Sequence, residues 1–196
     1  HASGRLRMDK PEKLSNMHET PKSIQRRCTI EHTLPEFYDF MWKREYGLGP
    51  MFQLIEHIYR NDYEACCPLT EYTAPDAPGY TMYPVYFDCC IQLMMAIVAW
   101  DTPLDIFKTY VPLGCGTFNL YQTSLNKGKK LWCHTDCSKS YTPGGDRLDS
   151  MDVITADLCV IDEDGDVVAE AINFRVKRAG KELLMNSLKE DLSSWK

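Results

Sequence analysis

The sequence predicts an α+β protein in which one antiparallel sheet wraps around a single buried helix. The segment YPVYFDCCIQLMMAIVAW, residues 83–100, is apolar on nearly every helical face, which is typical of a helix surrounded by protein. Four strand-like segments follow it, and the tight-turn sequence DEDGD at 162–166 separates the last two. One sheet around one central helix satisfies this order, which is the hot-dog arrangement.

Composition limits the possible classes of protein. The chain has 196 residues, which suits one domain, and 44% of them are hydrophobic, enough for a core. The net charge is −6 and the basic residues are scattered, which argues against a nucleic-acid surface. The longest apolar run is interrupted by Gln92 and is too short to span a bilayer, and no secretory signal opens the chain. We therefore expect a cytoplasmic protein without nucleic-acid or membrane partners.

Nine cysteines are present, and no Cys-x-x-Cys spacing occurs. Two adjacent pairs, at 66–67 and 89–90, suit neither zinc nor an ordinary disulfide. Most of the nine are therefore interpreted as small buried hydrophobes in a reducing compartment. The sequence Cys133-His134-x-x-Cys137 offers three metal ligands without a second half, so a strand with alternating side chains is favoured and no metal site is expected.

Residues 1–34 are predicted to be irregular. The stretch MDKPEKLSNMHETPKS has two prolines, many charges and no apolar period, which is typical of a linker. The opening HASGRLRM differs and resembles the end of a strand, as though another folded unit stops there. A helix is predicted next, over residues 35–44, from four residues at helical spacing: Leu34, Phe37, Tyr38 and Met41.

A hairpin is predicted over residues 52–69, with its turn at Arg60-Asn61-Asp62, followed by a loop at 70–82. The central helix begins near Pro84 and ends before Asp101-Thr102-Pro103. The strands that follow are predicted at four ranges: 110–123, 129–138, 152–161 and 167–178. The tail, 180–196, could form a short amphipathic helix.

Two polar residues of the central helix, Asp88 and Gln92, are candidates for chemistry. They are four residues apart and therefore share one helical face. An aspartate in an apolar setting gains a raised pKa, and the protonated acid can donate to a leaving hydroxyl while Gln92 holds its rotamer. The alternative stays open that Asp88 only complements the helix N-terminus and that Gln92 only binds a loop carbonyl.

The residues around this pair resemble the polyketide synthase dehydratase family, whose domains are double hot-dogs. GYTMYPVYFDCCIQ, 79–92, resembles the family's Gly-Tyr…His-Pro-x-x-x-Asp-x-x-x-Gln segment. LPEFYDFMWKREYGLGPMFQ, 34–53, resembles its tyrosine-containing helix and Tyr-Gly-Pro-x-Phe-Gln motif. HASGRL, YVPLGCGTFNLY at 110–121 and ADLCVIDEDGDVVAEAINFRVKRA at 156–179 are similar to the end of the first hot-dog, the strand after the helix and the closing hairpin.

The resemblance implies a domain organisation and a reaction. It implies the end of a first hot-dog plus a linker in 1–34, the C-terminal hot-dog in 35–180, and a linker or short helix in 181–196. In the family, a His of the first hot-dog removes the α-proton of a β-hydroxyacyl thioester, while an Asp of the second protonates the departing hydroxyl. By the motif, Asp88 is that acid and Gln92 its holder. No cofactor is implied. The implied partners are an acyl carrier protein with its phosphopantetheine arm, the N-terminal hot-dog and, through the parent synthase, a second copy.

The chain departs from the family pattern in three ways. The family's His-x-x-x-Gly-x-x-x-x-Pro motif does not occur, so the base His is expected outside this chain. Tyr83 stands where the family has His, and Leu48 where it has Tyr. The motifs imply a substrate pocket lined by seven residues: Tyr83, Pro84, Leu48, Gly49, Pro50, Pro112 and Gly114. The departures keep two alternatives open, which are a non-catalytic docking module and a dehydratase-like isomerase or cyclase.

Overall fold

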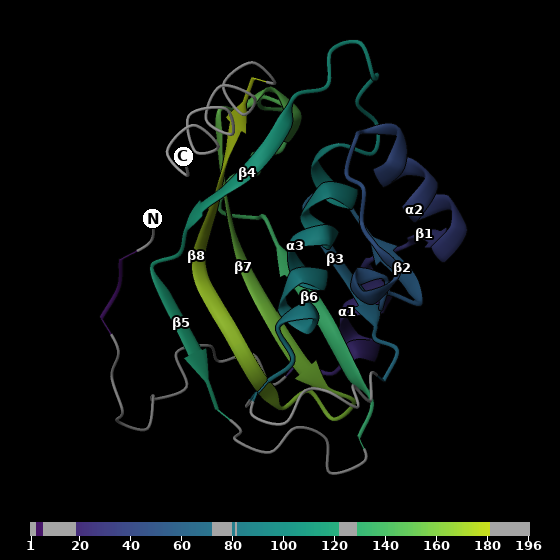
Figure 1. The fold of residues 1–196 in the computed structure, drawn as a ribbon, viewed down its shortest axis with the longest axis vertical. Coiled ribbons are helices and arrows are strands. Elements are labelled where there is room, and N and C mark those ends of the chain that lie inside the picture. Colours follow the sequence, from purple (N-terminus) through teal and green to yellow (C-terminus); the bar gives the residue numbers. More distant parts are fainter. Residues whose placement is uncertain (1–2, 6–18, 72–79, 81, 122–128, 181–196) are drawn as a thin grey trace, which may run out of the picture.

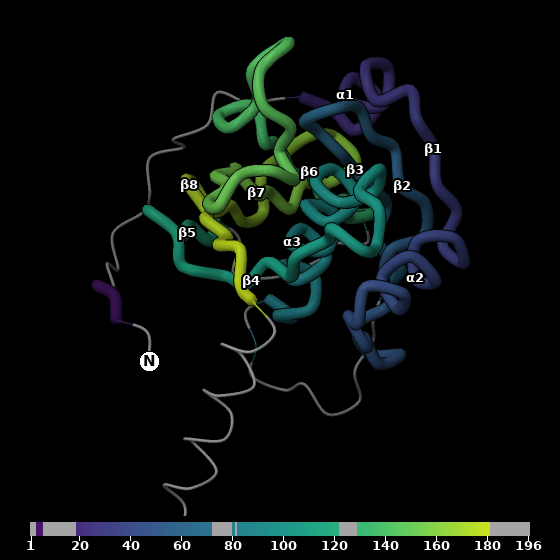
Figure 2. Tube along the Cα trace, turned by 90° about the horizontal axis from the view of Figure 1, so that it is seen from above, coloured from purple at the N-terminus to yellow at the C-terminus, as the bar shows by residue number. Residues whose placement is uncertain are grey.

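A single antiparallel sheet curves around helix α3 (Pro84–Val98) in the computed structural model (Figures 1 and 2). The structure describes residues 3–5, 19–71, 80, 82–121 and 129–180. Seen from above, the strands form an arc with α3 inside it (Figure 2). This arrangement confirms the predicted α+β hot-dog fold.

The sheet has eight strands in the described part of the chain, and its paired neighbours run antiparallel. In spatial order the path is β1 (Ile30–Thr33), β2 (His57–Arg60), β3 (Glu64–Pro68), β6 (Leu131–Asp136), β7 (Val153–Asp162), β8 (Val167–Ala179) and β4 (Thr109–Gly114). A further strand, β5 (Thr117–Leu120), also pairs with β8. The last two long strands form the predicted closing hairpin.

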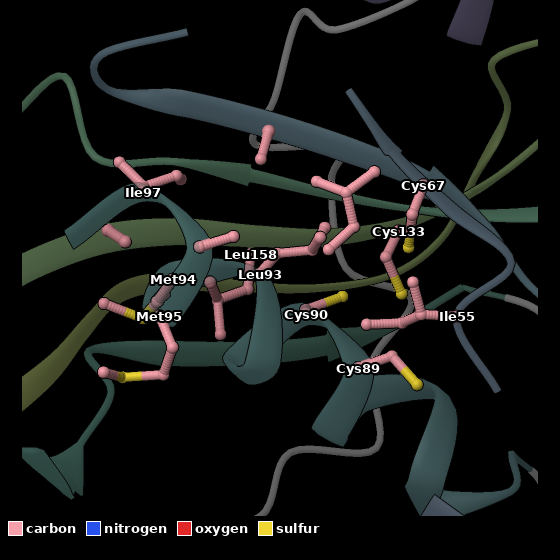
Figure 3. Packing of buried hydrophobic residues seen from close by; sticks show 14 of the residues in the cluster. Ile55, Cys67, Cys89, Cys90, Leu93, Met94, Met95, Ile97, Cys133 and Leu158 are labelled. Atoms are coloured by element: carbon pink, nitrogen blue, oxygen red, sulfur yellow. The ribbon is translucent and has the colours of Figure 1, made fainter. Parts of the chain in front are cut away.

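Helix α3 is buried on nearly every side, as its composition predicts. Pro84 occupies its first turn, where a missing N–H costs no hydrogen bond. Its inward residues pack against the concave face of the sheet, where Leu93 lies near Leu158 of β7 (Figure 3). Cys90 donates to the carbonyl of Cys159, and Thr135 of β6 donates to the carbonyl of Cys90. These contacts fix α3 relative to the strands and therefore fix the position of Asp88.

The convex face of the sheet has a second, smaller core beneath helix α1 (Pro21–Arg27). Neighbouring residues of one strand point to opposite faces, so Cys66 joins this outer cluster while Cys67 joins the core around α3. The expectation of irregular structure is therefore wrong for residues 21–27 and 30–33, which form α1 and β1. The local reason is that Thr20 caps the helix and Pro21 opens it.

Other elements lie close to their predicted positions. Helix α2 (Leu34–Lys43) matches the helix expected at 35–44. The predicted hairpin begins later than expected, because the 3₁₀ turn η1 (Pro50–Phe52) precedes β2. The single strand expected at 110–123 is two strands, β4 and β5, separated at Gly114, whose φ of 150° accompanies a shift in register. A second 3₁₀ turn, η2 (Leu148–Ser150), precedes β7, and the predicted tail helix lies outside the described residues.

All nine cysteines lie in the described segments as free thiols, and only Cys115 among them is exposed. In β6, Cys133 points into the core and donates to the carbonyl of Tyr86, whereas His134 points to the other face and bonds Glu64. The Cys133-His134-x-x-Cys137 motif thus alternates as a strand does. Within the described segments, no group of three or more His, Cys, Asp or Glu side chains could hold a metal ion. The helices described there include none with the length and apolar character needed to cross a bilayer.

Candidate active site

Asp88 and Gln92 face the same side of α3 and are hydrogen-bonded to each other. The Gln92 Nε2 donates to Asp88 Oδ2 over 2.8 Å. Gln92 is 3% exposed, whereas Asp88 is half-buried and remains partly accessible to solvent. The helical spacing therefore produces the contact that the sequence predicted.

Two further groups hold the Gln92 amide. Its Nε2 also donates to the backbone carbonyl of Phe52 in η1 over 2.9 Å, and its Oε1 accepts from the Tyr38 hydroxyl of α2 over 3.3 Å. A backbone carbonyl only accepts, so the amide nitrogen must face Phe52 and Asp88. Gln92 thus makes both contacts that sequence reasoning treated as alternatives, one to a loop carbonyl and one to the aspartate.

Burial raises the pKa of Asp88 above its ordinary value, and the hydrogen bond from Gln92 opposes that rise without cancelling it. Burial likewise raises the pKa of Tyr38, so its hydroxyl keeps its proton and remains a donor. The carboxyl group of Asp88 is therefore biased toward the protonated form that a general acid needs.

Aromatic side chains pack around Phe87, the residue that precedes Asp88 in α3. Phe87, the neighbouring residue in α3, packs edge-on against Phe118 of β5 and Phe174 of β8, with ring centroids 5.2 and 6.2 Å apart. Met51 of η1 is 56% exposed, and Phe118 is 47% exposed. Large apolar residues are thus accessible both on η1, which packs beside α3, and on β5, whose Phe118 meets Phe87.

The predicted pocket residues fall into two groups. Five of them lie at the start of α3, just before η1 or at its first residue: Tyr83, Pro84, Leu48, Gly49 and Pro50. Tyr83 and Leu48 are partly buried against the core, and the Leu48 carbonyl accepts from Gln53. Pro112 and Gly114 instead lie on β4, opposite Val176 and Arg175 of β8. Their contribution to a substrate pocket stays a prediction.

The described histidines are engaged elsewhere. His32 of β1 stacks on Trp100, just beyond the C-terminal end of α3, and its Nε2 accepts from Arg60 over 2.8 Å. His57 pairs with Glu31 over 3.1 Å. His134 bonds Glu64 on the convex face. His1 and His18 lie outside the described residues.

Sequence reasoning did not identify Tyr38 and Phe52 as partners of Gln92. Tyr38 had a helical-spacing signal, but the same signal marks any core residue of a short amphipathic helix. Phe52 acts through its backbone carbonyl, which no side-chain pattern can indicate.

The similarity to known proteins is consistent over most of the chain. A family model described as the polyketide synthase dehydratase N-terminal domain matches residues 17–186. The chain belongs to the polyketide synthase dehydratase family. A comparison with curated proteins gave no match.

Solved dehydratase structures share its fold. The dehydratase domain from the CurJ module of curacin polyketide synthase is 26% identical, with a TM-score of 0.66 over 87% of this chain and 56% of that one. An inactive His-to-Phe variant of the CurJ dehydratase, in complex with a compound, gives 28% identity and a TM-score of 0.67 over 85% and 55%. A trans-AT synthase dehydratase domain from Brevibacillus brevis is 17% identical, with a TM-score of 0.66 over 81% and 52%, and supports the fold alone. The chain therefore spans little more than half the length of these dehydratase domains.

Proposed function

We propose that this chain is the C-terminal hot-dog of a polyketide synthase dehydratase domain and that Asp88 is its general acid. The observation that carries this proposal is the half-buried carboxyl of raised pKa, held by the buried Gln92 in a chain of this family. The substrate would be a β-hydroxyacyl thioester on the phosphopantetheine arm of an acyl carrier protein. No cofactor takes part in the proposed reaction, and the site would operate in the cytoplasm.

The hydrogen bond from Gln92 determines which oxygen carries the acidic proton. Oδ2 already accepts from Gln92 Nε2, so the proton of the neutral acid resides on Oδ1. Asp88 Oδ1–H donates to the β-hydroxyl of the substrate, and the C–O bond breaks as water leaves. A base removes the α-proton, and the electron pair of that C–H bond forms the new double bond. The proton taken by the base is then returned to Asp88 through solvent.

The base would come from outside the described residues. The described histidines are held by other partners: His32, His57 and His134. His32 stacks on Trp100, which follows the C-terminal end of α3, whereas Asp88 lies near the N-terminal end of that helix. Among the related structures, a His-to-Phe variant of the CurJ dehydratase and an Asp-to-Asn variant of the CurK dehydratase are inactive. By analogy, the reaction here needs both an acid from this chain and a His from a first hot-dog.

The edge of the sheet near the site supports a companion hot-dog. β4 ends the strand order, and Leu113 and Phe118 at this end of the sheet are 54% and 47% exposed.

The name of the matching family model refers to the N-terminal domain, whereas we assign the chain to the C-terminal hot-dog on the basis of the Asp88–Gln92 motif. The residues that precede His1 in the parent protein distinguish these assignments. A His-x-x-x-Gly-x-x-x-x-Pro motif about one hot-dog length upstream supports ours, and its absence contradicts it.

Dehydration of a β-hydroxyacyl carrier-protein substrate by the full synthase segment tests the proposed activity. The change Asp88→Asn keeps an acceptor for Gln92 but removes the acidic proton, so we expect turnover to fall by about 100-fold or more. Asp39→Asn, at an exposed aspartate paired with Lys43, is the control and should leave turnover unchanged. Wild-type activity that survives Asp88→Asn would remove Asp88 from the mechanism.

The replacements at Tyr83 and Leu48 favour one alternative reaction on the same site. Tyr83 is the N-cap of α3 and Leu48 lies just before η1, so both replacements would change the predicted pocket while leaving the acid in place. A product in which the double bond has migrated, or in which a ring has formed, would indicate an isomerase or cyclase. A folded synthase that converts no carrier-bound substrate would indicate a docking module, which could also contribute to a homodimer of the synthase.

A further inference from the structure

Tyr38 connects the proposed acid to the rest of the fold through a directed series of hydrogen bonds. The Tyr38 hydroxyl donates to Gln92 Oε1, and Gln92 Nε2 donates to Asp88 Oδ2. Both donors in this series point toward Asp88, and the series joins α2 to α3.

A half-turn of the Gln92 amide would give a second orientation, in which its nitrogen and oxygen exchange places. In the observed one, the Phe52 carbonyl and Asp88 both accept from Nε2, and Tyr38 supplies the one donor observed at Oε1. In the reversed one, Oε1 would face the Phe52 carbonyl, which cannot donate, and it could accept only from a protonated Asp88. Because Gln92 is only 3% exposed, an Oε1 without a donor would be destabilising. The hydroxyl of Tyr38 therefore opposes the reversal.

We propose that Tyr38 is a positioning residue that keeps the Gln92 amide turned with its nitrogen toward Asp88. This role rests on the proposed function only in that Asp88 is the acid to be oriented. Its consequence is that the acidic proton stays on Oδ1, because Oδ2 always meets an N–H. The role of Tyr38 acts through Gln92 and requires no contact with substrate.

The pKa of Asp88 measures this positioning directly. In the 196-residue chain, ¹³C-labelled aspartate carboxyls can be titrated by NMR, with the Asp88 signal assigned by its loss in Asp88→Asn. Tyr38→Phe keeps the ring and removes the donor, so the reversed amide gains population and the neutral acid is favoured. We expect the pKa of Asp88 to rise by about half a unit to one unit.

Three comparisons separate positioning from a general structural effect. In a Gln92→Met background, Tyr38→Phe should no longer change the pKa of Asp88, because the connecting amide is gone. Tyr46→Phe is a matched control, since Tyr46 is also half-buried and its hydroxyl also donates over 3.3 Å, to the Tyr110 carbonyl. Tyr46→Phe should lower the stability of the chain without shifting the pKa of Asp88. When 3-fluorotyrosine replaces Tyr38, its hydroxyl is more acidic than that of tyrosine and is therefore a better hydrogen-bond donor. The pKa of Asp88 should fall as a result.

An unchanged pKa in both position-38 variants, or an equal shift in the Gln92→Met background, would refute the role of Tyr38. The fluorinated variant keeps the shape of the side chain, so the test stands even if Tyr38→Phe fails to fold. In the full synthase segment, Tyr38→Phe should shift the alkaline limb of the pH profile of kcat/KM to higher pH, because activity is lost as Asp88 ionises. The NMR result does not depend on turnover, so failure of the dehydratase assay and failure of this inference are distinguishable.

Discussion

The buried environment of His32 predicts that the chain loses stability as the pH falls from about 6.5 toward 4. Burial lowers the pKa of His32 to about 4, and the nearby Arg60 guanidinium adds to that effect. Arg60 Nε can only donate, so His32 Nε2 accepts and the ring proton resides on Nδ1. The neutral ring stacks on Trp100 with centroids 3.6 Å apart.

The sign and size of this loss of stability follow from the linkage between proton binding and folding. Above pH about 6.5 both the folded and unfolded chains hold His32 neutral, whereas between about 6.5 and 4 only the unfolded chain binds the proton. The free energy of unfolding therefore falls with pH across this window. One pKa unit is worth about 1.4 kcal/mol, so the whole shift amounts to at most about 3.5 kcal/mol, with about 2 kcal/mol lost by pH 5.

Urea unfolding at about pH 7 and about pH 5 measures the loss, with His32→Gln as the comparison. Glutamine does not titrate, and its side-chain carbonyl can accept from Arg60. The carboxylates Glu36 and Asp101 near His32 are present in both proteins, so the difference between the two isolates the histidine. We expect the wild type to lose about 2 kcal/mol more than the variant between the two pH values. Parallel losses in both chains would refute the assignment of His32 as a buried neutral ring.

Two further predictions concern stability. Burial opposes ionisation of the Asp88 carboxyl, and Asp88→Asn removes that carboxyl while keeping an acceptor for Gln92. The variant should therefore have a free energy of unfolding at neutral pH that is higher by on the order of 1 kcal/mol, measured by thermal melting. A lower melting temperature would contradict the raised pKa of Asp88. Gly165→Ala should destabilise by about 1–3 kcal/mol in urea unfolding, because φ is +89° and the new Cβ would lie 2.6 Å from the Glu19 carbonyl oxygen. Gly144→Ala, at φ +70° with no atom within 4 Å, is its control, and equal losses would show that the contact with Glu19 contributes nothing.

The central helix and the strands that follow it were predictable because their signals are local and strong. Helix α3 has apolar residues on every face, a proline in its first turn and a proline after its end. Helix α1 and strand β1 were missed because they lie on the convex face or at the edge of the sheet, where few residues are buried. In α1 only Pro21 and Ile24 are buried, which leaves no periodic pattern to detect. The capping pair Thr20-Pro21 was the available signal.

The candidate site was predictable only along its helix. A spacing of four residues brings Asp88 and Gln92 together whatever the rest of the chain does. The remaining members of the hydrogen-bonded group come from α2 and η1, which are 54 and 40 residues away from Gln92 along the chain. One of them is a backbone carbonyl. Such contacts depend on how elements pack, so no sequence pattern could have indicated them.

This arrangement explains how one carboxyl can be both buried enough to remain an acid and ordered enough to transfer its proton. A carboxyl with no hydrogen bond would have a higher pKa but no fixed orientation, and several donors would fix it but favour the ionised form. Here a single N–H from Gln92 meets Oδ2, and burial still raises the pKa of Asp88. The donor is itself held by groups that do not touch the carboxyl. Orientation is therefore supplied by Gln92 and its partners, while burial raises the pKa of the carboxyl.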